Sequence, residues 1–138
     1  MKTGTESVMF GVPAHHLNWH DALVEEVRME GTTLSVLLDF PLYSQSFYQD
    51  HLPENLKVQA SFDQVHFLSP EWNQLMQSPS GLWDAEIRTA HFQKDEERWR
   101  LELAVEVEDY PSKRRDPLFL VMEYASLQLT DQAGKQIA

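Results

Sequence analysis

Apolar and polar side chains alternate along much of this chain, so that residues two positions apart share a character. The clearest run is residues 99–107, where every second residue from Trp99 to Val107 is apolar and most of the residues between them are polar. A period of two is typical of a β-strand that buries one face. The pattern therefore predicts strands as the main elements of the fold.

The run 99–107 has a partner just before it in the chain. Residues 83–91 can pair with it as a hairpin if residues 93–97, "QKDEE", form a five-residue loop. In this register Arg88 lies opposite Glu102, and a cross-strand pair of opposite charges contributes about 0.2–1 kcal/mol. We expect this hairpin to be the best-defined part of the sheet.

A second hairpin is predicted over residues 23–38. Glu30 and Gly31 would form its two-residue turn, because glycine adopts the positive φ that such a turn requires. This register pairs Val27 with Leu34 on a face that is apolar except for two residues. A short helix over residues 19–28 accounts only for the first half of the pattern and is kept as the alternative.

Two further segments complete the pattern. Residues 56–62 alternate cleanly, and the apolar phase then flips after Asp63 and Gln64, which predicts a bulge or a tight turn there. The last strand begins at Leu118 with five apolar residues in succession, as expected of a strand covered on both sides. Residues 71–76 favour a single helical turn.

These elements predict an all-β fold. We expect a single antiparallel β-sandwich or strongly curled sheet of about seven strands with long loops. The alternative is an α+β fold with one short helix near residues 19–28. A length of 138 residues suits one domain, 1–138, in which residues 1–14 and 131–138 form loose termini.

The amino-acid composition excludes several classes of function but says little more about the fold. The absence of cysteine excludes disulfides, thiolate metal sites and cysteine catalysis, and it suits a cytoplasmic protein. A net charge of −11 repels phosphate backbones but speeds encounter with a basic surface. No apolar run approaches the length of about 20 residues that spans a membrane. We therefore expect neither nucleic acid nor a membrane as partner, and we expect the protein to reside in the cytoplasm.

The stretch "HHLNWHD", residues 15–21, holds the strongest candidates for a metal-binding or catalytic site. His16 and His20 are four apart, and Asp21 would make a third zinc ligand, the minimum for such a site. The favoured interpretation is structural: the His20–Asp21 pair begins the first strand and Trp19 plugs one end of the core. We expect no metal and no cofactor, and a metal site would have to use His16, His20 and Asp21.

Acid–base catalysis would need carboxylates in a cleft, and three lie on or near apolar faces: Asp21, Glu25 and Glu123. We expect each of them instead to be paired, at an edge or at a bulge. The chain has no nucleophile-elbow motif and no glycine-rich phosphate loop. The sequence therefore predicts a protein that is not an enzyme.

Aromatic residues gather in the predicted loops beside acidic ones. Large anchors surrounded by a polar rim are typical of protein interfaces, although the same residues can fold back over the end of a sandwich. The predicted partner-binding residues are Tyr43, Phe47, Tyr48, Asp50, Glu54 and Trp72. The predicted partner is another protein with a basic surface.

The order of the predicted elements is similar to that of a known group of proteins. A His-Asp pair opens a strand, the hairpin "MEGTTLSVLLDF" follows, then a strand ending "SFDQVHFLS", and the last strand holds "EYASLQL". Over residues 19–130 this resembles small β-rich bacterial proteins of unknown function, some grouped with immunity proteins of polymorphic toxin systems. The resemblance implies an acidic cytoplasmic protein that neutralises a toxin by binding it. A small enzyme or ligand binder that uses His16, His20 and Asp21 is the first alternative, and a structural subunit of a larger assembly is the second.

Overall fold

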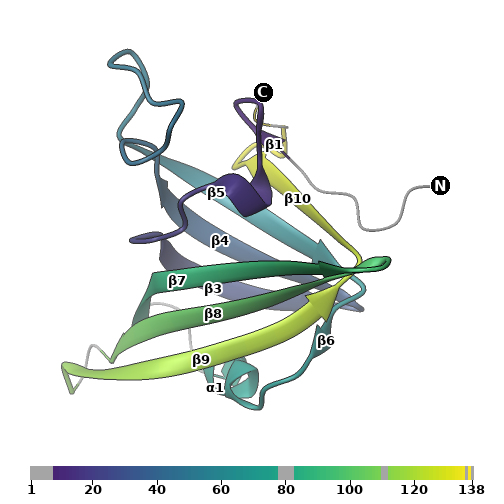
Figure 1. Cartoon of the computed structure of the whole chain (residues 1–138). Coiled ribbons are helices and arrows are strands. Elements are labelled where there is room, and N and C mark those ends of the chain that lie inside the picture. Colours follow the sequence, from purple (N-terminus) through teal and green to yellow (C-terminus); the bar gives the residue numbers. More distant parts are fainter. Residues whose placement is uncertain (1–7, 78–82, 110–111, 136, 138) are drawn as a thin grey trace.

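The computed structural model describes residues 8–77, 83–109, 112–135 and 137, and antiparallel strands dominate this part of the chain (Figure 1). The strands are β1 (Val8–Met9), β2 (Val12–Pro13), β3 (Leu23–Glu30), β4 (Thr33–Pro41), β5 (Asn55–Asp63), β6 (His66–Phe67), β7 (Trp83–Asp95), β8 (Arg98–Asp109), β9 (Arg114–Tyr124) and β10 (Ser126–Asp131). The helices are a single 3-10 turn, Ala14–His16, and α1, Glu71–Gln77. The mainly β antiparallel class is confirmed. The alternative helix over 19–28 is wrong, because β3 occupies most of that segment.

Eight strands form one sheet in the order β10-β5-β4-β3-β7-β8-β9-β6, and β1 pairs with β2 alone. The two ends of this order are linked through the chain, because β6 continues β5 and β10 continues β9. Asp63 pairs with Ser126. His66, three residues after Asp63, pairs with Glu123, three residues before Ser126, so one antiparallel register runs through both junctions. The sheet is bent accordingly: β7, β8 and β9 lie across from β3, β4, β5 and β10 (Figure 1).

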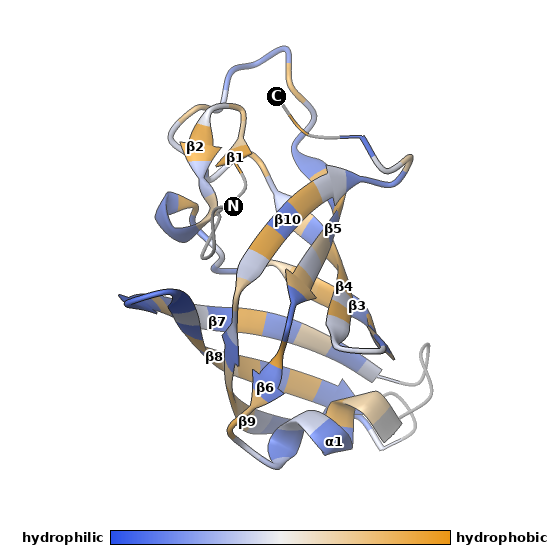
Figure 2. Cartoon of the chain, turned by 90° about the vertical axis from the view of Figure 1, so that its right-hand side faces the viewer, coloured by the Kyte–Doolittle hydropathy of each residue, from blue (hydrophilic) through white to orange (hydrophobic). Residues whose placement is uncertain are grey.

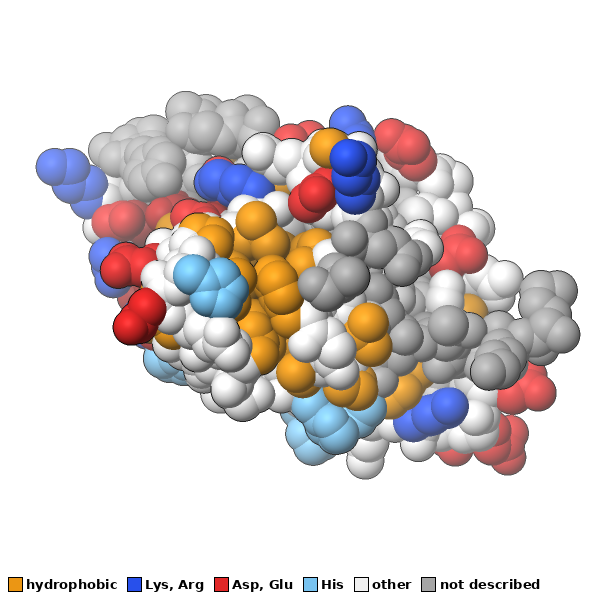
Figure 3. All heavy atoms as spheres, turned by 90° about the horizontal axis from the view of Figure 1, so that it is seen from above, with side chains coloured by type: hydrophobic (Ala, Val, Ile, Leu, Met, Phe, Trp, Pro, Cys, Tyr) orange, Lys and Arg blue, Asp and Glu red, His pale blue; other side chains and the backbone are white. Residues whose placement is uncertain are grey.

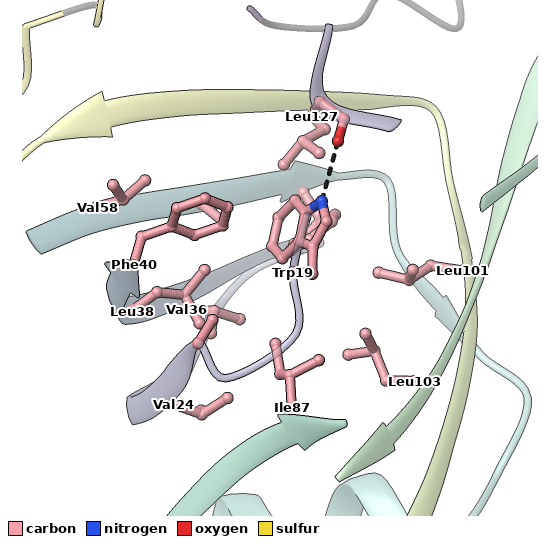
Figure 4. Packing of buried hydrophobic residues seen from close by; sticks show 14 of the residues in the cluster. Trp19, Val24, Val36, Leu38, Phe40, Val58, Ile87, Leu101, Leu103 and Leu127 are labelled. Carbon is pink, nitrogen blue, oxygen red and sulfur yellow. Dashed lines mark hydrogen bonds between the residues drawn. The ribbon is translucent and has the colours of Figure 1, made fainter. Parts of the chain in front are cut away.

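The hydrophobic core lies between these two parts of the sheet. Alternation along each strand sends every second side chain inward, and Figure 2 shows apolar and polar residues alternating along the ribbons of β8 and β9. Figure 4 shows side chains from β3, β4, β5, β7, β8 and β10 packed around Trp19. Trp19 is buried, as predicted, and its indole Nε1 donates a hydrogen bond to the carbonyl oxygen of Ala14 at 2.9 Å.

The hairpin predicted over residues 23–38 forms as β3 and β4, but in another register. Glu30 pairs with Thr33, so the two-residue turn is Gly31 and Thr32, and Gly31 has the expected positive φ of 62°. The predicted pairing of Val27 with Leu34 is wrong, because Val27 lies opposite Val36. A further irregularity at Glu25 shifts the register again toward the start of β3.

The hairpin of β7 and β8 is longer than predicted. β7 runs to Asp95 and pairs there with Arg98, so Glu96 and Glu97 form a two-residue turn in place of the predicted loop 93–97. Glu96 adopts a φ of 49°, the left-handed region that this turn needs. The predicted pairing of Arg88 with Glu102 is wrong, because Arg88 lies at a bulge between Ile87 and Thr89.

Two local predictions around β5 and α1 are confirmed. Gln64, where the apolar phase flips, has a φ of 52°, and β6 resumes on the other side of this irregularity. The expected helical turn is α1, which contributes Trp72 and Leu75 to the core. The prediction that β9 is covered on both sides fails at Phe119, whose side chain is 65% exposed on the outer face of the strand.

The termini are better ordered than the sequence suggested. Met9 is fully buried, and Ile137 is only 7% exposed. The amide of Phe10 donates to the carbonyl of Ile137 at 3.3 Å, which joins the two ends of the chain. The expectation of loose ends is therefore wrong at these positions, while residues 1–7 lie outside the described part. Among the described residues, no helix is long and apolar enough to cross a membrane.

Candidate functional site

The connection between β4 and β5, residues 42–54, projects from one end of the sheet (Figure 1). Its two ends are tied together, because the amides of Leu42 and Tyr43 both donate to the carbonyl of Glu54, at 2.7 and 3.1 Å. The loop thus returns to its starting point with its base hydrogen-bonded. The hydrogen bonds at its base hold the loop so that the residues at its tip project away from the sheet.

Gln45 fastens this loop to the segment that leads into β3. Its side chain is 7% exposed, and its amide nitrogen donates to the carbonyls of Asn18 at 2.7 Å and Pro41 at 2.9 Å. Its Oε1 accepts a hydrogen bond from the amide of Asn18 at 2.9 Å. Gln45 could not be identified from the sequence, because no pattern distinguishes a buried glutamine in a polar loop from a solvated one.

The three predicted loop aromatics occupy one neighbourhood with different exposures. Tyr43 is 52% exposed, while Phe47 and Tyr48 are half-buried. The ring of Phe47 packs on that of Phe10 with centroids 4.9 Å apart, and the hydroxyl of Tyr48 donates to the carbonyl of Leu52 at 3.4 Å. Phe47 therefore connects the loop to the β1–β2 hairpin, and Tyr43 is left with the largest free surface.

Seen from the end of the molecule that carries this loop, hydrophobic side chains gather on the surface (Figure 3). Acidic, basic and histidine side chains all lie at the margin of this apolar area in the same view. Asp50 and Glu54, the predicted acidic residues of the site, are both exposed on the loop, as is His51 between them. We call the surface formed by Phe10, Tyr43, Phe47, Tyr48, Asp50 and Glu54 the loop surface.

Trp72 does not belong to the loop surface. It is 2% exposed on α1, its ring lies 5.2 Å from that of Phe67, and its indole nitrogen donates to the carbonyl of Val121 at 3.0 Å. The prediction that it binds a partner is wrong. The residue is part of an amphipathic helical turn whose apolar side packs against the core.

The residues proposed as a metal site separate into two groups. His16 ends the 3-10 turn and its ring lies 4.0 Å from that of His15, whereas His20 Nδ1 lies 3.1 Å from Asp21 Oδ2. His16 and His20 do not lie on one side of a helix, because the chain is extended at Leu17, directly after the turn. Within the described ranges, no group of three histidine or carboxylate side chains could hold a metal ion.

Asp21 instead joins a charged cluster on the outer face of β7, β8 and β9. Arg88 contacts Glu86 and Glu106, each at 3.0 Å, and lies 3.9 Å from Asp21. Arg115 of β9 contacts Glu106 at 3.1 Å and Glu108 at 3.6 Å. We call these residues the outer charged face.

The pKa values of Glu86 and Glu106, which both contact Arg88, are shifted in opposite directions. Partial burial, with a hydrogen bond to Asp21, raises the pKa of Glu86. Hydrogen bonds from Arg88 and Arg115 lower the pKa of Glu106. A raised carboxyl pKa is a feature of general acids, but the outer charged face is half-exposed and its carboxylates are engaged by two guanidinium groups.

Of the other two carboxylates singled out from the sequence, Glu25 is paired and lies at a bulge, as expected. Glu25 lies at the register shift of β3 and pairs with Lys57, and the hydrogen bond from Lys57 to Glu25 raises the lysine pKa. Glu123 lies half-buried on β9, with Arg100 opposite it in β8 and His66 opposite it in β6. Asp21, Glu25 and Glu123 thus take part in three different sets of contacts.

Comparisons of this chain with protein-family models, with curated proteins and with solved structures found no match.

Proposed function

We propose that this protein is a non-enzymatic acidic binding domain that recognises another protein through the loop surface. The observation that carries the proposal is Tyr43, a large aromatic side chain that is 52% exposed on a loop fastened at its base by Gln45. A tyrosine held in place loses little conformational entropy on binding, which is why tyrosines are frequent energetic centres of interfaces.

The charge of the protein supports a partner with a basic surface. Asp50 and Glu54 lie on the same loop as Tyr43, and the whole chain carries a net charge of −11. Acidic side chains at the rim of an apolar centre raise the rate of encounter with a basic partner and fix its orientation. An immunity-type inhibitor that neutralises a toxin by occupying it is the specific form that we propose.

The test is affinity capture from an extract of the source cell with matched variants. Wild-type protein, Tyr43→Ala and Phe119→Ala are immobilised at equal density, and bound proteins are compared at low and high salt. Phe119 is the control because it is the more exposed aromatic residue, at 65%, and belongs to β9, away from the loop (Figure 1).

We expect a basic protein to be retained by wild type and by Phe119→Ala, to be lost from Tyr43→Ala, and to elute as salt is raised. Truncation of an interface centre costs about 2 kcal/mol or more, a loss of roughly thirtyfold in affinity. Equal retention by all three forms, or loss from Phe119→Ala alone, would count against the loop surface.

A further inference from the structure

Strand β9 leaves part of one sheet edge unpaired. It pairs with β8 along its whole length, from Arg114 to Tyr124, whereas β6 pairs with it only at Met122 and Glu123. Figure 1 shows β6 beside that end of β9. Over the ranges that the structure describes, no strand pairs with the first half of β9 on this side. We call residues 115–119 of β9 the open edge.

The hydrogen bonds of Val121 show which backbone groups face the open edge. Its carbonyl accepts from the amide of Leu68 at 2.9 Å, and its amide donates to Ser69 Oγ at 2.9 Å. Alternate residues of a strand direct their backbone groups to the same side, and the register between β8 and β9 is regular. The N–H and C=O groups of Phe119 and Arg115 therefore face the open edge, and neither residue has a partner for them in the described part of the chain.

The open edge is accessible and has an apolar side chain beside it. Residues 114–117 are exposed without a break, and Phe119 is 65% exposed on the outer face of β9. Leu68, which is 42% exposed, lies opposite Val121 and is therefore a diagonal neighbour of Phe119 on the same face. An added strand would thus find both unpaired backbone groups and an apolar contact.

Pro117 lies in the middle of the open edge and decides between two kinds of occupant. Proline is tolerated in an edge strand because its missing N–H is not needed for a ladder there. A second copy of this chain is a poor occupant, since two-fold pairing centred on the edge sets Pro117 against Pro117, with no N–H on either side. Such pairing also brings together two chains of net charge −11. A segment of a different protein meets neither obstacle.

The start of the open edge is basic, although the chain as a whole is acidic. Lys113, Arg114 and Arg115 form the one run of three basic residues in the sequence. Arg115 contacts carboxylates of β8, whereas the side chain of Arg114 is 76% exposed beside Asp116. Lys113 is exposed in the turn just before β9. In an antiparallel added strand, the residues opposite Lys113 and Arg114 lie toward its C-terminal end, so acidic side chains suit that end.

We propose that the open edge receives an extended segment of another protein as an added antiparallel strand. Backbone hydrogen bonds supply the affinity of strand addition, and side-chain contacts supply its specificity. The segment places an apolar side chain opposite Phe119 and acidic side chains five and six residues later, opposite Arg114 and Lys113. The site shares no residue with the loop surface and selects the opposite charge in its partner.

The experiment measures binding of a fluorescent peptide to the full-length protein by anisotropy. The peptide is Thr-Tyr-Thr-Val-Thr-Thr-Glu-Glu, whose tyrosine lies opposite Phe119 when its glutamates lie opposite Arg114 and Lys113. The control peptide has the same residues in reverse order. We expect saturable binding of the first peptide and binding about tenfold weaker for the second, because it matches the edge only as a parallel strand. No saturable binding, or equal affinity of the two peptides, would overturn the proposal.

Two methylated forms of the first peptide test the backbone hydrogen bonds themselves. A methyl group on the tyrosine nitrogen removes the N–H that faces the carbonyl of Phe119, whereas one on the next threonine nitrogen removes an N–H that points away from β9. We expect the first form to bind about tenfold more weakly, because a backbone hydrogen bond is lost, and the second to bind as the parent does. Equal affinities of the two forms would rule out strand addition.

Exposed side chains of the protein supply the matching variants. We expect Phe119→Ala to weaken peptide binding by about tenfold or more, as truncation of an aromatic anchor does, and Tyr43→Ala to leave it unchanged. Arg114→Gln should weaken binding at low salt, whereas Arg28→Gln, which removes an exposed charge from β3, should not. Full affinity of Phe119→Ala, or an equal loss from Tyr43→Ala, would contradict the assignment of this edge. Self-association that Phe119→Ala abolishes would make a second copy the occupant and would also overturn it.

Discussion

At the scale of single residues, two neighbouring glutamates have pKa values shifted in opposite directions. Glu86 and Glu106 both contact Arg88 at 3.0 Å, yet the pKa of Glu86 is raised and that of Glu106 is lowered. Glu86 is partly buried and lies beside Asp21, a second carboxyl group, and both raise its pKa. Glu106 instead accepts hydrogen bonds from two guanidinium groups, those of Arg88 and Arg115. Burial and neighbours, and not the residue type, decide which form of each carboxyl group folding favours.

We expect Glu86→Gln to stabilise the protein at pH 7. A raised folded-state pKa means that the stability contributed by Glu86 is present below its unfolded pKa, about 4.3, and is lost as the pH rises through the folded value. The uncharged glutamine avoids that loss. Thermal unfolding midpoints against pH check this, and the gain over wild type should disappear in acid.

We expect the opposite sign for Glu106→Gln. The pKa of Glu106 is lowered, so its contribution is present above the unfolded pKa and is lost as the pH falls through the folded value. Glu106→Gln should therefore lower the unfolding midpoint at pH 7 and approach wild type in acid. The same sign for both variants at pH 7 would contradict this account of the outer charged face.

We expect Gln45→Ala to loosen the loop surface. The change leaves the amide and carbonyl of Asn18 and the carbonyl of Pro41 without their partner, at a cost of about 1–3 kcal/mol for an unsatisfied buried group. Urea unfolding measures the loss. Gln49→Ala, an exposed position on the same loop, is the control and should change stability little; an equal effect of the two would remove Gln45 as the anchor.

At the scale of elements, the turn between β3 and β4 depends on one backbone angle. Gly31 has a φ of 62°, and a Cβ built there meets no atom within 4 Å, so only backbone strain opposes a side chain. We expect Gly31→Ala to lower the free energy of unfolding by about 1 kcal/mol. Gly31→Asn should cost less, because asparagine tolerates this region better. Chemical denaturation compares them, and a larger loss for asparagine would be inconsistent with the strain.

Alternation identified the strands, and irregularities within them decided the register. On β7 the buried positions are Trp83, Ala85 and Ile87, followed by the half-buried Ala90 and Phe92. The apolar phase changes at Arg88, which a continuous strand does not allow. This change was visible in the sequence, but the predicted pairing kept one phase and so placed polar residues inward.

The helical turn α1 decides where Trp72 lies. The sequence predicts a turn of helix over residues 71–76 and also a partner-binding role for Trp72, and these two predictions conflict. On a helix Trp72, Leu75 and Met76 share one face, and that face packs on the core. The spacing therefore predicted burial of Trp72 once the helix was accepted, whereas nothing in the spacing separates Tyr43 from Phe47 and Tyr48.

At the scale of the whole molecule, the bend of the sheet could not be read from the sequence. It depends on pairing between residues 58–67 and 122–131, and such distant contacts have no local signature. The bend encloses the hydrophobic core on the inside and leaves the 42–54 loop at one end (Figure 1). The loop surface and the outer charged face thus occupy different parts of the exterior.

Backbone hydrogen exchange, measured on the free protein and on its complex with the captured partner, tests whether the loop surface contacts a partner protein. We expect slower exchange for the amides of residues 43–52 on binding, with β9 unchanged. Slower exchange confined to β7, β8 and β9, and none in the loop, would contradict it.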